Sequence, residues 1–170
     1  MTTATINKPV TETVDLVITR EFNATREEVW KAWTDPEMMK RWWGSKDFTT
    51  PVSTIDLRVG GRFLYCMRGP GPDGVVTDVW GTGTYKEIVP LEKIVCTDSF
   101  ADEKGNIVPA THYGMGPEFP LELLITVTFE DVGRNTAITL RHAGLPAGRM
   151  REMTATGWNE SFDKLDEILK

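Results

Sequence analysis

Hydrophobic residues recur at helical spacing along the last stretch of the chain, from about residue 146 to residue 170. Placed at 100° steps, the apolar side chains gather on one half of a helix, and acidic and amide side chains lie opposite. The apolar half carries Met150, Met153, Gly157, Trp158, Phe162, Leu165, Ile168 and Leu169. The pattern therefore predicts one long amphipathic C-terminal helix that packs against a large apolar surface.

The middle of this apolar half carries only small residues, namely Thr154, Gly157 and Ser161. A glycine inside a helix costs about 1 kcal/mol relative to alanine, so Gly157 requires a structural reason. Either the helix backbone packs closely on a strand at this point, or the helix forms one wall of a cavity. The residues of the helix leave both explanations open.

Alternation of apolar and polar residues predicts seven strands before this helix. They cover residues 14–22, 53–59, 62–68, 76–89, 93–100, 121–129 and 136–142. The Gly60-Gly61 pair predicts a two-residue hairpin turn between the second and third strands. Residues 1–13 show no periodicity and are predicted to form a flexible N-terminal tail in front of a single domain, residues 14–170.

Two capping motifs predict short helices between the first and second strands. Thr25 and Glu28 fit a capping box, in which each residue binds a free backbone N–H of the other. Asp35 and Pro36 fit the start of a second helix, which Gly44 is expected to end. Because two helices this short cannot form a bundle, they are expected to cover part of the sheet.

A connection of unusual length, residues 101–120, joins the fifth and sixth strands. Compact domains seldom contain an irregular connection this long, and this one includes His112, Tyr113, Met115 and Phe119. We expect the segment to fold over an opening in the domain, with a surface insertion as the alternative.

The composition excludes several classes of protein. The 170 residues suit one domain with a core of its own. A net charge of -6 argues against nucleic acid, whose phosphates require a basic surface. No run approaches the ~18 apolar residues of a membrane span, and the first residues lack the apolar core of a signal peptide. A cytoplasmic protein without a membrane span is expected.

The cysteines and histidines give no sign of a metal site. Cys66 and Cys96 lie within predicted strands, and neither has a second cysteine or a histidine at metal-ligand spacing. His112 and His142 likewise form no ligand motif. We therefore expect buried thiols, no metal and no cofactor.

Several motifs occur in an order that resembles a known family. They are residues 25–36 (TREEVWKAWTDP), 42–44 (WWG), 56–63 (DLRVGGRF), 72–74 (PDG) and 157–158 (GW). The chain resembles the activator of heat-shock protein 90 ATPase homologues, within the START-related, polyketide-cyclase and birch-pollen-allergen-like (SRPBCC) superfamily. The resemblance implies an α+β helix-grip fold: a curved seven-stranded antiparallel sheet wrapped around a long C-terminal helix, with two short helices between strands 1 and 2.

The resemblance also implies a binding site. In this superfamily an elongated cavity between sheet and helix takes a hydrophobic or aromatic small molecule, which favours the cavity explanation of Gly157. The residues expected to line the cavity are Phe63, Tyr65, Met67, His142, Thr154, Gly157, Trp158 and Ser161. Those expected at its mouth are Trp43, Phe48, Tyr113 and Met115.

Three functions remain open. The favoured one is binding of a hydrophobic or aromatic small molecule for sequestration, transport or sensing. The second is a co-chaperone-like protein-interaction domain in stress response, with a chaperone or homodimer contact. The eukaryotic co-chaperones that name the family carry a further N-terminal domain. Because these 170 residues suit the helix-grip domain alone, direct activation of the chaperone ATPase is not expected. The third is a cyclase- or hydrolase-type enzyme acting on a polyketide-like substrate, although the sequence contains no catalytic constellation.

Overall fold

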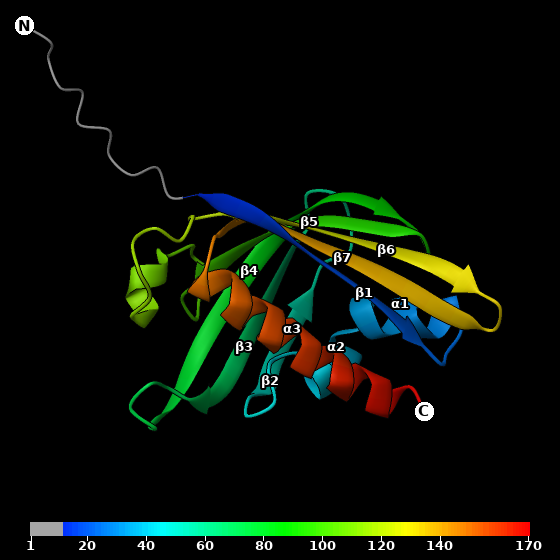
Figure 1. Cartoon of the computed structure of the whole chain (residues 1–170), viewed down its shortest axis with the longest axis horizontal. Helices are drawn as coiled ribbons and strands as arrows, with labels where there is room; N and C mark the ends of the chain where they lie inside the picture. Colours follow the sequence, from blue (N-terminus) through cyan, green and yellow to red (C-terminus); the bar gives the residue numbers. More distant parts are fainter. Residues whose placement is uncertain (1–11) are drawn as a thin grey trace, which may run out of the picture.

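One antiparallel sheet and one long helix dominate the architecture of the chain. The computed structural model describes residues 12–170. Its seven strands form an open sheet in the order β1-β7-β6-β5-β4-β3-β2, and the C-terminal helix α3 lies across one face of it (Figure 1). Strands β2 to β7 each pair with their neighbours in sequence, while β1 pairs with β7. The predicted α+β helix-grip fold is confirmed.

The order of elements follows the prediction closely. The strands are β1 (Thr13–Phe22), β2 (Thr49–Ile55), β3 (Arg62–Pro70), β4 (Val76–Val89), β5 (Lys93–Ala101), β6 (Leu123–Val132) and β7 (Asn135–Pro146). The helices are α1 (Arg26–Thr34), α2 (Pro36–Trp42) and α3 (Arg149–Ile168), with a short 3-10 helix η1 (Ala110–Tyr113) between β5 and β6. Residues 1–11 of the predicted tail lie outside the described residues, and Thr13 already belongs to β1. No helix within residues 12–170 is long and apolar enough to cross a membrane.

Both short helices begin at the predicted caps. The Thr25 hydroxyl accepts a hydrogen bond from the Glu28 N–H at 3.2 Å, and the Thr25 N–H donates to the Glu28 carboxylate at 3.2 Å. The Asp35 carboxylate accepts from the Glu37 N–H at 2.9 Å. These bonds satisfy N–H groups that have no partner within the helix.

The predicted hairpin at Gly60-Gly61 is wrong. Strand β2 ends at Ile55, which pairs with Phe63, so the loop covers residues 56–61. Only Gly60 has a positive φ, of 84°. The strand also starts earlier than predicted and contains Pro51, which is tolerated because β2 lies at the sheet edge and a free N–H is not needed there.

Aromatic side chains fill the core beneath the C-terminal half of α3. Phe22, Trp42 and Phe162 have no solvent exposure. The Trp42 indole N–H donates to the backbone oxygen of Ala32 at 2.9 Å, which satisfies its only polar atom. Through these contacts α3 packs on α2, β1 and β7.

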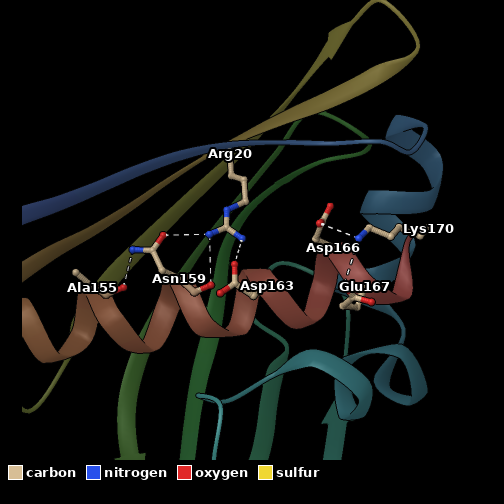
Figure 2. A network of polar contacts seen from close by, with 7 residues as sticks. All are labelled: Arg20, Ala155, Asn159, Asp163, Asp166, Glu167 and Lys170. Carbon is tan, nitrogen blue, oxygen red and sulfur yellow. Dashed lines mark hydrogen bonds and ion pairs between the residues drawn. The ribbon is translucent and has the colours of Figure 1, made fainter.

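Arg20 of β1 binds polar groups on the solvent-facing side of the same half of α3 (Figure 2). Its guanidinium donates to the Asp163 carboxylate at 2.7 Å and to both oxygens of Asn159 at 3.4 Å. The guanidinium carbon also lies 5.8 Å from the centre of the Phe162 ring. Arg20 therefore joins an edge strand to the helix by charge and by packing.

Replacing Arg20 with methionine is expected to lower the free energy of unfolding by less than about 1 kcal/mol. Methionine keeps the apolar stem over Phe162 and removes the ion pair with the exposed Asp163 carboxylate. Urea denaturation at low and high salt measures the effect, which should shrink at high salt because salt screens exposed charges. An equal loss at both salt concentrations would contradict an electrostatic origin.

The two thiols are expected to be unreactive in the folded protein. Cys66 is 1% exposed and Cys96 is 8% exposed, and burial raises the pKa of each thiol above its ordinary value. Since the thiolate is the reacting species, a disulfide reagent such as DTNB at pH 8 should label the native protein much more slowly than the guanidinium-unfolded protein. Rapid labelling of either cysteine without denaturant would contradict this burial.

Candidate functional site

A cavity of about 190 Å³ lies between α3 and the strands that its N-terminal half crosses. The sheet and its connections contribute Tyr65, Met67, Asp98, Ser99, Phe100, Phe119, Leu123 and His142. Trp43, Gly44 and Ser45 follow α2, and α3 contributes Thr154, Gly157, Trp158 and Ser161. The wall therefore draws on four strands, one helix and two connecting segments.

Gly157 explains why the space stays open. A Cβ atom added to Gly157 would meet no atom within 4 Å beyond the helix's own backbone and chain neighbours, so no strand packs against this point of the helix. Helix α3 instead packs through its C-terminal half on β1, β7 and α2. Of the two explanations for this glycine, the structure therefore favours a cavity wall over close packing.

The size of the cavity limits what it can hold. Sites for drug-sized ligands usually have volumes of about 300–1,000 Å³. A cavity of ~150 Å³ engineered in another protein binds benzene. At about 190 Å³, the present cavity is smaller than expected for an elongated ligand and matches a single substituted aromatic ring.

Glycines on β4 position the aromatic side chains of β3. Tyr65 pairs with Gly81 across the strands, and Phe63 pairs with Gly83. A Cβ atom at either glycine would collide with the ring of its partner, so both rings lie across the β4 backbone. This arrangement lays the Tyr65 ring along the cavity floor.

Four polar side chains form a chain through the cavity wall. The Trp158 indole N–H donates to Nδ1 of His142 at 3.1 Å. Nε2 of His142 lies 3.3 Å from Oδ2 of Asp98, and the Tyr65 hydroxyl donates to Oδ1 of Asp98 at 3.4 Å. Burial, and secondly the Asp98 carboxylate, raise the pKa of the Tyr65 phenol well above its ordinary value, so Tyr65 stays a hydrogen-bond donor.

The contact with Trp158 fixes the tautomer of His142. An indole nitrogen can only donate, so Nδ1 of His142 must be the acceptor and carry no hydrogen. The ring hydrogen is therefore on Nε2, which is buried and has no well-aligned hydrogen-bond partner within residues 12–170. This N–H, the hydroxyl of Ser99 and the two Asp98 oxygens are polar groups of wall residues with unused hydrogen-bonding capacity.

A second void of about 40 Å³ lies behind the first. Trp43 and Tyr65, whose ring centres are 5.2 Å apart, border both spaces. Phe63, which was predicted to line the main cavity, borders this inner void instead, because its ring packs 5.6 Å from that of Tyr85.

The other predicted lining residues lie around the main cavity. They are Tyr65, Met67, His142, Thr154, Gly157, Trp158 and Ser161. Of the two α3 hydroxyl residues that line the cavity, Thr154 donates back to the Met150 backbone oxygen at 2.8 Å. Binding of a ligand by these residues stays a prediction.

Of the residues predicted at the mouth, only Trp43 borders the cavity. The Phe48 ring lies against the backbone of Gly69. The Tyr113 hydroxyl accepts from the Trp80 N–H at 3.1 Å and donates to the backbone oxygen of Ala101, which fixes η1 to the sheet. Met115 is likewise absent from the cavity wall.

Several wall residues were missed by sequence reasoning, notably Asp98, Phe100, Phe119 and Leu123. A signal for Asp98 was available. Ile94, Cys96, Asp98 and Phe100 alternate along β5, which places one acidic residue on an otherwise apolar strand face. Phe119 reaches the wall from the 101–120 connection, where its ring packs 5.4 Å from that of Phe100.

The wall residues include one carboxylate, one imidazole, one phenol and several hydroxyls, and the rest of the surface is largely apolar. These groups can orient a ligand through hydrogen bonds. Within residues 12–170, no cluster of three or more histidine, cysteine, aspartate or glutamate residues could hold a metal ion.

Residues 23–170 match the family described as Activator of Hsp90 ATPase homolog 1-like protein. No curated protein sequence matches the chain.

Solved bacterial structures share the fold. A Chromobacterium violaceum protein aligns with a TM-score of 0.73 and 23% identity over 91% of this chain and 96% of its own. A Mycobacterium smegmatis protein aligns with a TM-score of 0.71 and 24% identity over 95% of this chain and 98% of its own. The AHSA1 protein from Silicibacter pomeroyi aligns with a TM-score of 0.68 and 22% identity over 92% of this chain and 97% of its own. At these identities the likeness establishes the fold alone.

Proposed function

The chain belongs to the family of Activator of Hsp90 ATPase homolog 1-like proteins, and we propose that it binds one small aromatic molecule in the cavity beneath α3. The observation that carries this proposal is the open space at Gly157. A helix interior glycine lowers stability by about 1 kcal/mol, and here no close backbone contact offsets that cost. A cavity kept open for a ligand accounts for it.

The composition of the wall supports a binding role. Ligand sites combine a mostly apolar lining with a few polar groups that set orientation. Here aromatic side chains provide the apolar part. The Nε2–H of His142, which has no well-aligned hydrogen-bond partner within residues 12–170, and the Asp98 carboxylate provide the polar part. A buried polar group without a partner is costly, and a bound ligand would supply the missing partner.

The same groups favour binding over turnover. Acid–base catalysis would need a side chain that exchanges protons with the ligand. Nδ1 of His142 is occupied by Trp158, and the phenol of Tyr65 holds its proton firmly because burial raises its pKa. Contact with a chaperone, formation of a homodimer and location in the cytoplasm stay predictions.

Native mass spectrometry of gently purified protein, followed by titration with single-ring probes, tests the proposal. We expect either a copurified small molecule or one-to-one, saturable binding of a neutral probe such as benzyl alcohol, measured by calorimetry. Burial of the ring should give a negative heat-capacity change. Absence of copurified ligand, together with no saturable binding of neutral, cationic or anionic single-ring probes, would overturn the proposal.

A further inference from the structure

The Asp98 carboxylate lies partly buried in the cavity wall without a cationic side chain beside it. Its side chain is 19% exposed, and no lysine or arginine in residues 12–170 lies within ion-pair distance of it. It is the only aspartate or glutamate among the wall residues, which include no lysine or arginine. Its contacts to Tyr65 and His142 are long, at 3.4 and 3.3 Å, and leave most of its acceptor capacity unused. Buried charges in proteins are normally paired.

The contacts of His142 leave one ring N–H for Asp98. A positively charged imidazole carries hydrogens on both nitrogens. Nδ1 already accepts the hydrogen of the Trp158 indole at 3.1 Å, so a second hydrogen there would meet the indole N–H head-on. With Nδ1 occupied in this way, the imidazole presents only its Nε2–H to Asp98, at 3.3 Å, and no lysine or arginine of residues 12–170 is near enough to pair with the carboxylate.

The rest of the wall suits a cation. Aromatic side chains of Trp43, Phe100, Phe119 and Trp158 surround the space beside Asp98. The faces of aromatic rings attract cations within about 6 Å of the ring centre, most strongly when the cation is removed from water. An N–H-bearing cation would thus find acceptor oxygens on one side and aromatic rings on the others.

We propose that the natural ligand is a small protonated amine that carries a single aromatic or similarly sized apolar group, with its ammonium against the Asp98 carboxylate. This inference rests on the proposed function, since it names the chemical class that the same cavity takes. The volume of about 190 Å³ limits the apolar part to roughly one ring.

The surroundings of the cavity favour delivery of such a ligand. A shallow depression on the solvent side shares Ser45 and Gly157 with the cavity, and its charged members are Glu152, Glu160 and Arg149. The chain as a whole carries a net charge of -6. Negative potential around an opening raises the local concentration of cations and lowers that of anions.

A charge series of matched probes tests the inference. Benzylamine, benzyl alcohol and benzoate share one ring and differ in charge, and each is titrated into the full chain at pH 7.5 by calorimetry. Alkyl amines are protonated at this pH, as lysine is. We expect benzylamine to bind at least about tenfold more tightly than benzyl alcohol, because hydrogen bonds to a charged partner are the stronger ones, and benzoate to show no binding.

The variant Asp98→Asn keeps the shape of the side chain and removes its charge. It should remove the preference for the amine, so that benzylamine and benzyl alcohol bind the variant with affinities within about threefold of each other. Circular dichroism and thermal unfolding of the variant show whether it is folded. If benzyl alcohol binds the natural chain and benzylamine does not, the amine inference fails and the proposed function stands. If no probe binds and no small molecule copurifies, both fail.

Nitrogen NMR of the histidine rings provides an independent test of the charge argument. The chain has two histidines, so His112→Gln assigns the remaining signals to His142. At pH 7 we expect an Nδ1 shift typical of an unprotonated nitrogen and an Nε2 shift typical of N–H. A doubly protonated His142 would balance the charge of Asp98 and overturn the inference.

Discussion

Replacing Phe162 with alanine is expected to lower the free energy of unfolding by about 3–5 kcal/mol. The Phe162 side chain has no solvent exposure. Its ring lies 5.6 Å from that of Trp158, 6.0 Å from that of Phe22 and 6.3 Å from that of Trp42, so it links α3 to both β1 and α2. Removing it leaves a cavity among large rigid rings that cannot collapse to fill it. Urea denaturation followed by circular dichroism measures the loss.

The matched control for this truncation is Phe162→Leu. Leucine fills most of the volume and prefers a helix at least as well as phenylalanine, so its cost should be well below that of alanine. Alanine itself favours a helix more than either residue, so helix propensity cannot account for a loss. A loss below about 1 kcal/mol for Phe162→Ala would contradict the docking of α3 through this ring.

The elements of the fold could be predicted because most depend on local pattern. The apolar half of α3 and the alternation along β6 follow from spacing within a single element. The wrong prediction of a hairpin turn at Gly60-Gly61 also comes from reliance on local pattern. Leu57 and Val59 continue the apolar alternation of β2, yet they are 39% and 62% exposed and belong to the loop. Pattern alone does not distinguish an apolar strand residue from an apolar loop residue.

The helical side of the site was predictable, and most of the loop side was not. Placing residues at 100° steps puts Thr154, Gly157 and Ser161 on one line, which is where the structure has the cavity. Phe48, Phe119 and Tyr113 lie in connections whose paths depend on contacts with distant strands, such as that between the Tyr113 hydroxyl and the Trp80 N–H. No sequence period encodes such contacts.

Replacing Gly157 with leucine is expected to abolish measurable binding of single-ring ligands while the protein becomes more stable. The new side chain would project into open space, since even its Cβ atom meets nothing within 4 Å. Leucine also favours a helix by roughly 0.8 kcal/mol over glycine. Calorimetric titration with benzyl alcohol and benzylamine measures the loss of binding, and thermal unfolding measures an expected rise in Tm of about 2–4 °C for a gain near 1 kcal/mol.

The control Thr156→Leu places the same side chain on the preceding residue of α3, which is exposed. It should leave binding of both probes unchanged. If Gly157→Leu binds as the natural chain does, the ligand site lies elsewhere. If the substitution destabilises the protein, Gly157 serves close packing after all. The two explanations predict different results for Gly157→Leu. If the glycine is needed for close packing, the variant loses both stability and binding. If the glycine keeps a cavity open, the variant gains stability and loses binding.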